Sequence, residues 1–527
     1  MRARTSERRV GTARAKGVTL GAARARVVTV EARFERAPDA QEGAKARSEM
    51  TITGLPDAMI RESRGRLLAA LAAHQMPVPA GRLMLHLLPA SLKKSGELLD
   101  LAMTLAAAAA VGFVPPDALD SVLFLGEVGL DGRLRAVPGG LAAADAGRAE
   151  GLTTLVAPPE TAREAAALPR VRAFACADLR EVLGLLSGAA ATPLAPPDIR
   201  PAHDPLESGR PLLLDEVRGQ GLGKRAAQVA AAGGHGLLFT GPPGAGKSLL
   251  ARALADLLPP PNLEERVEVT RVLSAAGRWP GGLAERRSFR APHHTTSFGG
   301  LVGGGSPPAP GEITLAHLGV LFLDELPEFR REVLEGLRQP LEEGRILISR
   351  AGRQAHMPAD FQLVCAMNPC PCGYQGHPRR PCRCAPSAVA RYRQRISGPL
   401  LDRIDLRLEL TPPGLEELLE EPHPNPQSTP GPAPEAHRYR AVRNARDAML
   451  DRQGKVNARL ETRELDRYVP LTGERRELLL QAAERRSLSA RALQSLRRVA
   501  RTLADLDGSE SVARKHLAEA LTLRLEL

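Results

Sequence analysis

The sequence predicts an α/β protein built around a nucleotide-binding domain. Residues 241–248 read GPPGAGKS and match the phosphate-loop pattern G-x-x-x-x-G-K-[S/T] at every fixed position. Two further apolar runs, residues 319–323 and 361–367, each end in residues that suit nucleotide chemistry. After residue 437, leucines and arginines recur three and four positions apart, which is typical of helices. These observations predict a central parallel sheet, preceded by a mixed α+β domain and followed by a helical domain.

The phosphate loop has the flanking pattern that its chemistry requires. Residues 236–240 are apolar and predict a buried strand, whereas residues 249–254 predict a helix. Glycines let successive backbone N–H groups face phosphate oxygens, and the helix N-terminus adds its positive end. We expect Lys247 to reach the β- and γ-phosphates of ATP and Ser248 to ligate Mg2+. The expected nucleotide-binding residues of this loop are Gly241, Pro242, Pro243, Gly244, Ala245, Gly246, Lys247 and Ser248.

The ends of the other two apolar runs supply the remaining parts of a hydrolysis site. Residues 319–323 predict a buried parallel strand that ends in Asp324 and Glu325. Two adjacent carboxylates are costly to bury unless a metal or a reaction requires them. We expect Asp324 to hold Mg2+ through water, Glu325 to polarise the attacking water, and Asn368 to hydrogen-bond that water or the γ-phosphate. Taken alone, Asn368 also fits an ordinary turn residue. The phosphate-loop pattern, taken alone, also fits a chance turn rich in glycine and proline. The spacing of all three motifs favours the catalytic interpretation.

Composition favours a polyanionic partner and excludes a membrane span. The 527 residues suffice for about three domains. A formal net charge of +12 favours nucleic acid, although an arginine-rich proteome gives the same balance. Aromatic residues make up only 3%, so a surface built on base stacking is not expected. The sequence has neither an apolar run of membrane-spanning length nor an apolar signal core, so we expect a cytoplasmic protein.

The chain divides into three blocks that are separated by Pro-rich linkers. Residues 101–114 are apolar but too short to span a membrane, so they predict a core helix of the first block. The expected order is a disordered basic arm (1–16), an N-terminal domain (17–190), a linker (191–211), the nucleotide-binding domain (212–411), a Pro-rich linker (412–435) and a helical domain (436–527).

Four of the six cysteines cluster as two C-x-C pairs: Cys370, Cys372, Cys382 and Cys384. The polar, turn-forming segment between the pairs lets them converge. In a reducing compartment such a cluster is more often a zinc site than a set of disulfides. We therefore expect structural zinc, with free or redox-active thiols as the alternative. Cys176 and Cys365 are expected to be core residues.

With these motifs placed, the chain resembles the Mg-chelatase-like AAA+ ATPases of the YifB/ComM family over nearly its whole length. The resemblance rests on the segments GLPDAMIRESR, APHHTTS, GEITLAHLGVLFLDELPEF, CAMNPCPCGY and GPLLDRIDL. It implies a Lon-protease-like α+β domain of the ChlI type, a central AAA+ P-loop α/β domain and a C-terminal helical lid. It also implies a homohexamer that hydrolyses ATP with Mg2+. ComM-type proteins are associated with DNA branch migration during natural transformation, so branched or single-stranded DNA and recombination proteins are the expected partners.

The same resemblance assigns two arginines. Arg403, in GPLLDRIDL, matches the family's arginine finger, which reaches the γ-phosphate bound to the neighbouring subunit. Arg491, in LSARALQSLRRVARTLADL, matches the sensor arginine of the lid. A guanidinium suits both roles because it bridges two oxygens of a transferring phosphoryl group. Without the resemblance, both residues would be interpreted as solvated surface charges.

Two inserts also resemble those of this AAA+ clade. The first contains adjacent His293 and His294, which do not predict a metal because neighbouring side chains point differently on most backbones. In the second insert, residues 344–357, apolar and polar residues alternate on both sides of Arg350-Ala-Gly-Arg353. This pattern predicts a β-hairpin with a basic tip. In a ring, six such tips would line the pore and contact DNA phosphates.

The N-terminal block lacks the residues that Lon-type proteolysis needs, a serine nucleophile and a lysine base. In the matching segments, Leu98 occupies the serine position, and Ala142 and Ala144 occupy the positions where lysines are expected. Ser95 is nearby but out of register. The resemblance therefore implies a proteolytically inactive domain that serves assembly or substrate contact.

Three other functions compete with a DNA motor. A Mg-chelatase ATPase subunit, which powers metal insertion into a tetrapyrrole, uses the same core, but the basic charge, the hairpin and the fused N-terminal block favour DNA. An ATP-dependent protease is disfavoured by the missing serine and lysine. A non-enzymatic scaffold is least favoured, because every residue expected for hydrolysis is present.

Overall fold

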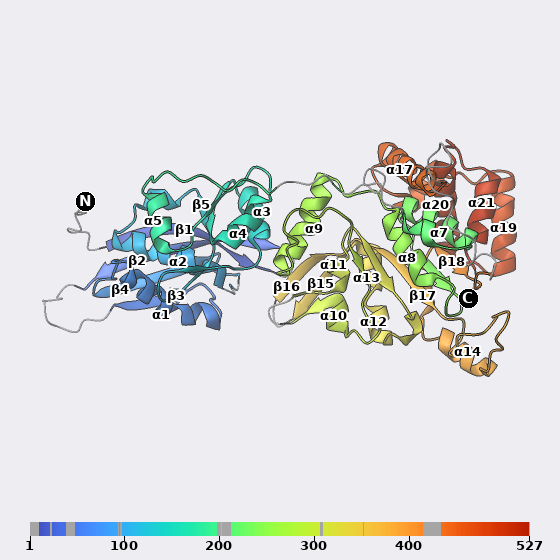
Figure 1. The fold of residues 1–527 in the computed structure, drawn as a ribbon, viewed down its shortest axis with the longest axis horizontal. Coiled ribbons are helices and arrows are strands. Elements are labelled where there is room, and N and C mark those ends of the chain that lie inside the picture. Colours follow the sequence, from blue (N-terminus) through green and yellow to red (C-terminus); the bar gives the residue numbers. More distant parts are fainter. Residues whose placement is uncertain are drawn as a thin grey trace.

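The computed structural model describes residues 10–21, 24–37, 48–92, 94, 97–197, 202, 212–305, 309–350, 353–414 and 434–525. An N-terminal domain, a nucleotide-binding domain and a bundle of C-terminal helices follow one another along its long axis (Figure 1). The expected mixed α/β fold with C-terminal helices is confirmed. Most of the two expected linkers lies outside the described residues.

A seven-stranded sheet in the order β3-β4-β2-β1-β5-β8-β9 forms the N-terminal domain. Its strands are β1 (Val10–Leu20), β2 (Ala25–Arg36), β3 (Glu49–Thr53), β4 (Gly81–Leu88), β5 (Val122–Phe124), β8 (Thr154–Ala157) and β9 (Arg172–Ala175). A separate small ribbon pairs β6 (Glu127–Val128) with β7 (Leu134–Arg135).

The first strand corrects the expectation of a disordered arm over residues 1–16. Residues 10–16 belong to β1, which pairs antiparallel with β2 over its whole length. Ala13 and Ala15 are buried while Arg14 between them is exposed, which is the alternation of a strand with one covered face. The arginines suggested a solvated arm, but the alanines between them fill the core. Residues 1–9 lie outside the described part of the chain.

Five helices pack on this sheet: α1 (Ala58–Ala73), α2 (Asp100–Val111), α3 (Gly140–Ala149), α4 (Pro159–Ala166) and α5 (Leu179–Leu186). The expected core helix over residues 101–114 is confirmed by α2, whose residues from Asp100 to Ala110 are all buried. Leu98, Ala142 and Ala144, the residues at which the resemblance led us to look for a Lon-type nucleophile and base, are buried apolar residues. Ser95 lies outside the described residues.

The nucleotide-binding domain contains a five-stranded sheet in the order β11-β14-β17-β10-β18, and all its strand pairs are parallel. The strands are β11 (Phe289–Arg290), β14 (Val320–Leu323), β17 (Gln362–Met367), β10 (Leu237–Thr240) and β18 (Leu406–Glu409). Three of them confirm the predicted buried strands. Because the strands are parallel, their C-terminal ends share one edge of the sheet, here called the carboxyl edge, and their starts share the opposite amino edge.

Helices lie around this sheet, and two small ribbons belong to the inserts (Figure 1). The helices are α6 (Leu213–Glu216), α7 (Gly221–Gly233), α8 (Lys247–Asp256), α9 (Leu263–Ala275), α10 (Phe298–Val302), α11 (Glu312–Leu315), α12 (Arg331–Glu335), α13 (Arg338–Glu343), α14 (Pro386–Arg393) and α15 (Gly398–Leu401). In the first insert, β12 (Gly303–Gly304) pairs with β13 (Ala309–Pro310). In the second, β15 (Arg345–Arg350) pairs with β16 (Arg353–Pro358), which confirms the predicted hairpin.

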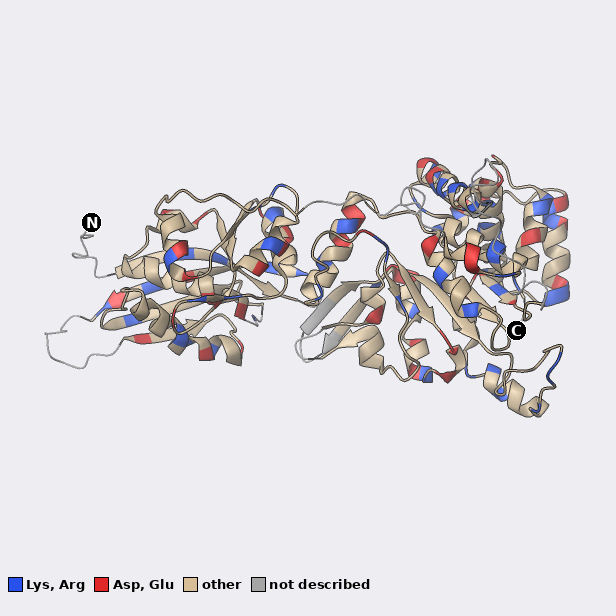
Figure 2. Cartoon of the chain, viewed as in Figure 1, with Lys and Arg blue, Asp and Glu red and all other residues tan. Residues whose placement is uncertain are grey.

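The C-terminal helices dock on the amino edge of the sheet through a buried polar junction. These helices are α17 (Pro434–Gln453), α18 (Thr462–Tyr468), α19 (Glu474–Arg486), α20 (Ala490–Leu506) and α21 (Arg514–Thr522). His235, just before β10, contacts Asp405 through Nδ1 and Thr502 of α20 through Nε2, both at 2.8 Å. Ser495 of α20 donates to the same carboxylate at 2.6 Å. Along the outer helices, Lys and Arg are mixed with Asp and Glu (Figure 2).

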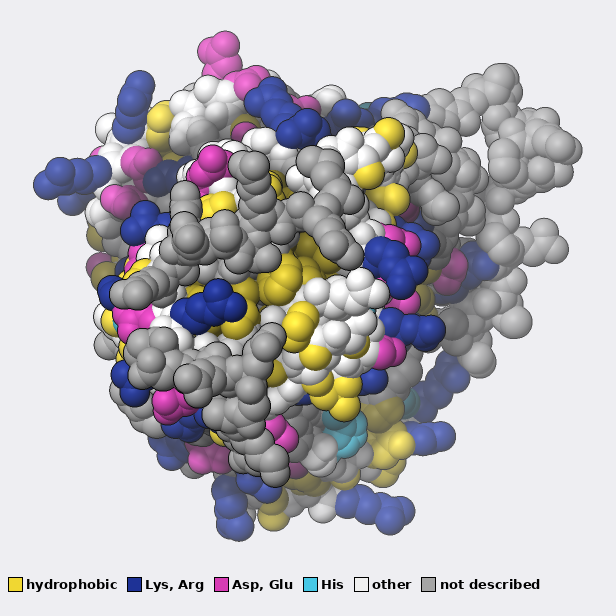
Figure 3. Space-filling model, turned by 90° about the vertical axis from the view of Figure 1, so that its left-hand side faces the viewer, with side chains coloured by type: hydrophobic (Ala, Val, Ile, Leu, Met, Phe, Trp, Pro, Cys, Tyr) yellow, Lys and Arg dark blue, Asp and Glu magenta, His cyan; other side chains and the backbone are white. Residues whose placement is uncertain are grey.

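The N-terminal and nucleotide-binding domains contact each other through α3 and α9. The amide of Ala142 donates to Ser274 Oγ at 3.1 Å, and Arg271 pairs with Asp145 at 3.1 Å. The opposite end of the N-terminal domain shows charges of both signs around some exposed apolar side chains (Figure 3).

Candidate active site

The loop of residues 241–246 connects the end of β10 to the start of α8 and has the open shape of a phosphate cradle. Gly244 and Gly246 adopt φ values of +81° and +83°, and a Cβ added at either would meet nothing within 4 Å. Side chains there would be strained and would project into the open space. The following helix begins at Lys247 without a side-chain cap, which leaves its first N–H groups facing the loop.

Lys247 crosses the loop and joins it to the end of β17. Its Nζ donates to the carbonyl oxygens of Gly241 and Pro242 at 2.6 and 3.0 Å and to Asn368 Oδ1 at 3.1 Å. Burial lowers the pKa of Lys247, and the nearby carboxylates of Asp324 and Glu325 oppose that shift. The ammonium is therefore held at the mouth of the cradle by weak neutral acceptors, which a phosphate oxygen outcompetes.

Ser248 and Asp324 form the second contact between the loop and the sheet. Ser248 Oγ donates to Asp324 Oδ2 at 2.8 Å, although the residues are 76 positions apart. The other carboxylate oxygen, Oδ1, accepts from the amide of Glu325 at 2.9 Å. A hydroxyl and a carboxylate at hydrogen-bond distance beside an open phosphate loop are the oxygen ligands that Mg2+ prefers. The residues present thus fit the cation.

Glu325 lies at the same edge but faces a different partner. Its backbone has a φ of +53°, which is uncommon for a residue other than glycine. Its Oε2 lies 3.0 Å from Nδ1 of His294, which follows β11, and half of the Glu325 side chain is exposed. The structure therefore brings Asp324, Glu325 and Asn368 to one edge, as the sequence predicted. It also shows a contact between Glu325 and His294 that the sequence did not predict.

The cysteine cluster directly follows this edge. The Sγ atom of Cys370 lies 3.4 Å from that of Cys372 and 3.6 Å from that of Cys382, and all four sulfurs, including Cys384, lie within 4.8 Å of one another. A tetrahedral site with Zn–S bonds of about 2.3 Å places its sulfurs about 3.8 Å apart. Backbone N–H groups of Arg383 and Tyr374 lower the pKa of Cys372 to about 6, which favours its thiolate. For Cys382, a hydrogen bond from the Cys384 amide is outweighed by burial and by the neighbouring thiols, which raise its pKa to about 12. The cluster is therefore able to bind a metal ion.

Arg403 and Arg491 lie together, far from the cradle of their own chain. Both guanidiniums contact Oε1 of Glu342, and both line one groove of about 650 Å3. Residues at the starts of three strands, Gly236, Gly319 and Gln362, line the same groove. The groove is thus at the amino edge, and the length of β10, about 13 Å, separates it from the phosphate loop.

The single carboxylate of Glu342 neutralises only part of the positive charge of Arg403 and Arg491. Partial burial raises the pKa of Glu342, but hydrogen bonds and charge from Arg491 and Arg403 outweigh it and leave the pKa below its ordinary value. One carboxylate therefore forms ion pairs with two guanidiniums at the mouth of the groove. An incoming phosphate would find two donors held side by side.

The hairpin β15–β16 places the backbone of Arg350 opposite Arg353 at its last pair. The side chains of both arginines, and residues 351 and 352 between them, lie outside the described residues. The predicted hairpin is confirmed, whereas contact of its tip with DNA stays a prediction.

Gln220 and His294 belong to the site but were not predicted. Gln220, in a left-handed conformation at the start of α7, donates through Nε2 to the carbonyls of Ala245 and Thr411 at 3.1 and 2.6 Å. It therefore ties the loop to the end of β18. A Gly-Gln-Gly sequence before a helix was its only signal, and His294 was identified only as part of a histidine pair.

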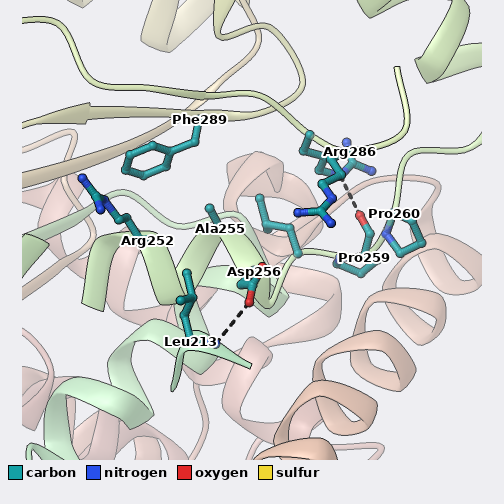
Figure 4. A pocket seen from close by; sticks show the side chains of 10 residues that line it. Leu213, Arg252, Ala255, Asp256, Pro259, Pro260, Arg286 and Phe289 are labelled. Atoms are coloured by element: carbon teal, nitrogen blue, oxygen red, sulfur yellow. Dashed lines mark hydrogen bonds between the residues drawn. The ribbon is translucent and has the colours of Figure 1, made fainter. Parts of the chain in front are cut away.

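A smaller pocket of about 240 Å3 lies at the far end of α8 from the phosphate loop (Figure 4). Asp256 accepts from the Leu213 amide at 3.2 Å, and Arg287 donates to the Pro259 carbonyl at 2.8 Å. Asp256 and Arg287 are thus engaged in holding α6 and the α8–α9 connection. The pocket adds no residue to the site at the carboxyl edge.

Cys176 and Cys365 are buried, as predicted, and burial raises the pKa of both thiols. Among the residues that the structure describes, only the four clustered cysteines form a group of three or more metal-ligating side chains. Within the same residues, no helix is both long and apolar enough to cross a bilayer.

Comparison with known proteins shows which family has this arrangement. Three family profiles match: "Magnesium chelatase, subunit ChlI" over residues 213–418, "Subunit ChlI of Mg-chelatase" over residues 40–161, and "Magnesium chelatase, subunit ChlI C-terminal" over residues 435–524. YifB of Salmonella typhimurium is 39% identical over 486 residues, which cover 90% of this chain and 91% of that protein. The competence protein ComM of Haemophilus influenzae is 38% identical over 481 residues, with the same coverage.

A more distant similarity reaches the chelatases themselves. The magnesium-chelatase 67 kDa subunit of Chlorobaculum parvum is 28% identical over 162 residues, which cover 30% of this chain and 23% of that protein. Since identity to YifB and ComM extends over nine-tenths of the chain, the protein belongs to the YifB/ComM family of Mg-chelatase-like AAA+ proteins.

Proposed function

We propose that the protein hydrolyses ATP at the carboxyl edge of its central sheet. The observation that carries this proposal is the pair of contacts that join the phosphate loop to two other strands. Lys247 reaches Asn368 at 3.1 Å, and Ser248 reaches Asp324 at 2.8 Å. Four residue types that phosphoryl transfer requires thus converge from distant parts of the sequence.

Each residue has a role that follows from its chemistry. Lys247 would bind the β- and γ-phosphates, Ser248 would ligate Mg2+, and Asp324 would hold the same cation through water. The cation supplies neutralisation of phosphate charge when it is bound with ATP. Glu325 orients and polarises the attacking water, and the Asn368 amide hydrogen-bonds that water or the γ-phosphate.

The position of the two arginines favours action on a neighbouring subunit. Arg403 and Arg491 sit at the amino edge, across the sheet from their own phosphate loop. In a closed ring, the amino-edge groove of one subunit would face the carboxyl edge of the next. This arrangement supports a homohexamer in which each ATP is completed by the arginines of the adjacent subunit.

We infer that the ring acts on DNA, with branch migration during recombination of transforming DNA as the ComM-like activity. Three features support this step: a net charge of +12, the hairpin with arginines at its tip, and identity of 38% to a competence protein. Contacts from Arg350 and Arg353 would engage phosphates, so binding should tolerate sequence and weaken steeply with salt.

We also propose zinc as the metal of the four-cysteine cluster. Sulfur separations of 3.4 to 3.6 Å between Cys370, Cys372 and Cys382 approach those of a tetrahedral zinc–thiolate site. Gly373, within the same loop, packs against Pro243, since a Cβ there would lie 3.0 Å from Pro243 Cδ. A metal in this loop would therefore stiffen one wall of the phosphate cradle.

The alternative is an ATPase subunit that powers insertion of Mg2+ into a tetrapyrrole. The family profiles and the similarity to a chelatase subunit over 30% of the chain favour it. The chelatase-like function would use the same ATP site as the DNA motor. Only the partner on which the ATPase acts distinguishes the two functions. Stimulation of ATP hydrolysis by DNA separates the two functions.

The deciding experiment measures ATP hydrolysis and migration of a synthetic mobile four-way junction by the purified protein. DNA-stimulated hydrolysis with migration supports the motor. The double variant Arg350→Ala/Arg353→Ala should keep basal hydrolysis, lose DNA stimulation and flatten the salt dependence of DNA binding. Arg345→Ala, at the base of the same hairpin and paired with Glu343, is the matched control and should behave as wild type.

A protein that hydrolyses ATP but neither binds nor responds to branched DNA would favour the chelatase-like function. If the double variant migrates junctions at the wild-type rate, the role of the hairpin tip is wrong.

A further inference from the structure

We propose that the cysteine loop (residues 369–385) and α14 form a second DNA surface, which holds a duplex arm of branched DNA by its phosphates. This surface rests on the proposed action on DNA and lies outside the hairpin. Residues 361–401 contain six arginines and neither aspartate nor glutamate. In Figure 2 the loop and α14 show blue without red, whereas α19 shows both colours. The charge of this segment thus has one sign only.

Three of these arginines, Arg379, Arg383 and Arg391, have available guanidiniums. All three residues are exposed, and among the described residues their side chains form neither a hydrogen bond nor an ion pair. Arg395, at the end of the segment, instead pairs with Glu328 at 2.8 Å. Several unpaired guanidiniums without a nearby carboxylate attract a polyanion, and phosphate oxygens are acceptors that suit them.

The loop is held in shape by contacts that do not use these three side chains. Arg380 donates to the Tyr374 hydroxyl at 3.0 Å, and its guanidinium lies 5.4 Å from the centre of that ring. His377 Nδ1 accepts from the backbone amides of Arg379 and Arg380 at 3.0 and 3.1 Å. The three guanidiniums are therefore carried on an ordered backbone, and replacing them should leave the fold intact.

The surface lies far from the hairpin tip. The hairpin β15–β16 ends at Pro358, just before β17 begins, whereas the cysteine loop follows the end of β17. The six residues of β17 span about 20 Å. In Figure 1 the hairpin and α14 accordingly lie on opposite sides of the nucleotide-binding domain. DNA held at the hairpin tips would leave the cysteine loop uncovered, and a branched substrate supplies further duplex arms to occupy it.

The aromatic residues of the segment favour a duplex arm over a single strand. Proteins that hold single-stranded DNA commonly stack its bases on aromatic rings. The Tyr374 ring is already engaged by Arg380 and, at 5.7 Å between centroids, by His377. Tyr392, on α14, is buried. Guanidiniums without an available ring suit the phosphates of a duplex, whose bases stay stacked inside it.

The test measures binding of a labelled four-way junction and of a labelled single strand by fluorescence anisotropy across salt concentrations. Arg379→Ala/Arg383→Ala/Arg391→Ala should bind the junction more weakly than wild type. Its slope of log affinity against log salt should become shallower by about three, one unit for each lost phosphate contact. Single-strand binding should stay close to wild type. The triple lysine variant keeps the charges and should retain most of the junction affinity.

A matched control removes the same charge elsewhere. Arg463→Ala/Arg476→Ala/Arg485→Ala changes three exposed arginines of α18 and α19, where glutamates lie between the arginines. This variant should bind the junction as wild type does. Thermal unfolding and metal content of each variant control for folding, and light scattering without DNA measures assembly.

The outcomes separate this surface from the motor function. Weaker junction binding with normal single-strand binding supports the surface, even in a protein that fails to migrate junctions, which would overturn the motor alone. If the alanine variant binds and migrates junctions like wild type or like the control, the surface is wrong and the motor stands. Loss of assembly in the alanine variant would assign the arginines to a neighbouring subunit and overturn the surface. A wild-type protein that binds neither DNA overturns both proposals.

Discussion

Lys247 Nζ and Asn368 Oδ1 lie 3.1 Å apart, so the phosphate loop and the end of the third predicted strand form one polar site. The two side chains come from residues 121 positions apart. Their contact means that the lysine has a partner before nucleotide binds. It also places the amide beside the lysine that we propose to bind the γ-phosphate.

Replacing the two residues should separate ATP binding from hydrolysis. Lys247→Ala should weaken ATP binding strongly, because it removes the charge that meets the phosphates. Asn368→Ala should keep affinity within a few-fold and lower kcat about 100-fold, the scale seen when one oriented donor is lost. Equilibrium binding of a fluorescent ATP analogue and steady-state hydrolysis measure the two effects. Equal loss of affinity in both variants would show that Asn368 serves binding.

Subunit mixing should show whether Arg403 and Arg491 act on the neighbouring ATP. Arg403→Ala mixed with Lys247→Ala should recover hydrolysis, because about a quarter of the interfaces in random rings combine an intact loop with an intact arginine. Arg491→Ala mixed with Lys247→Ala should recover it equally, since the structure places both arginines on one groove.

A mixture of Arg403→Ala with Arg491→Ala is the matched control, because every interface then lacks one guanidinium. Rings that form but stay inactive when Arg491→Ala is mixed with Lys247→Ala would mean that Arg491 acts within its own subunit.

Protein purified without added metal should contain about one zinc per chain. Cys372→Ser should remove the zinc and lower the affinity for ATP, because the cluster packs beside Pro243. Elemental analysis and binding of the ATP analogue check both results. Cys176→Ala, which changes a buried cysteine outside the cluster, should keep the zinc. Four titratable thiols in folded, zinc-free protein would instead favour reactive cysteines.

Asp405→Asn should loosen the C-terminal helices from the sheet. Burial raises the pKa of Asp405, but the hydrogen bonds from His235 and Ser495 outweigh burial and lower it below the ordinary 3.8. The ionised carboxylate therefore stabilises the fold above pH 3.8, and this contribution disappears as pH falls through the lower pKa of the folded state.

At neutral pH the substitution should cost about 3 kcal/mol, as expected when one member of a buried pair is removed. Denaturant unfolding across pH measures this cost, and the gap to wild type should narrow only below pH 3.8. Asp402→Asn, at a carboxylate that is 40% exposed, is the control and should change stability by less than about 0.5 kcal/mol. A gap that already closes well above pH 3.8 would show that ionisation of Asp405 does not govern the junction.

The sequence by itself identified the residues that meet at the carboxyl edge. Strand–loop–helix periodicity around residues 241–248, and two apolar runs that end in Asp324 and Asn368, carry local signals that need no tertiary information. Parallel strands then bring their ends together whatever the connections between them. The same local patterning identified the hairpin of residues 345–358 and the helical C-terminus.

The tertiary structure alone decided which residues face one another across long separations. Nothing in the spacing of His294 and Glu325 predicts their contact, because it depends on β11 pairing beside β14. The grouping of Arg403 with Arg491 likewise depends on how α20 docks on the amino edge. The basic N-terminal stretch was misjudged because alternating alanines pair with β2, and pairing partners lie outside any local window.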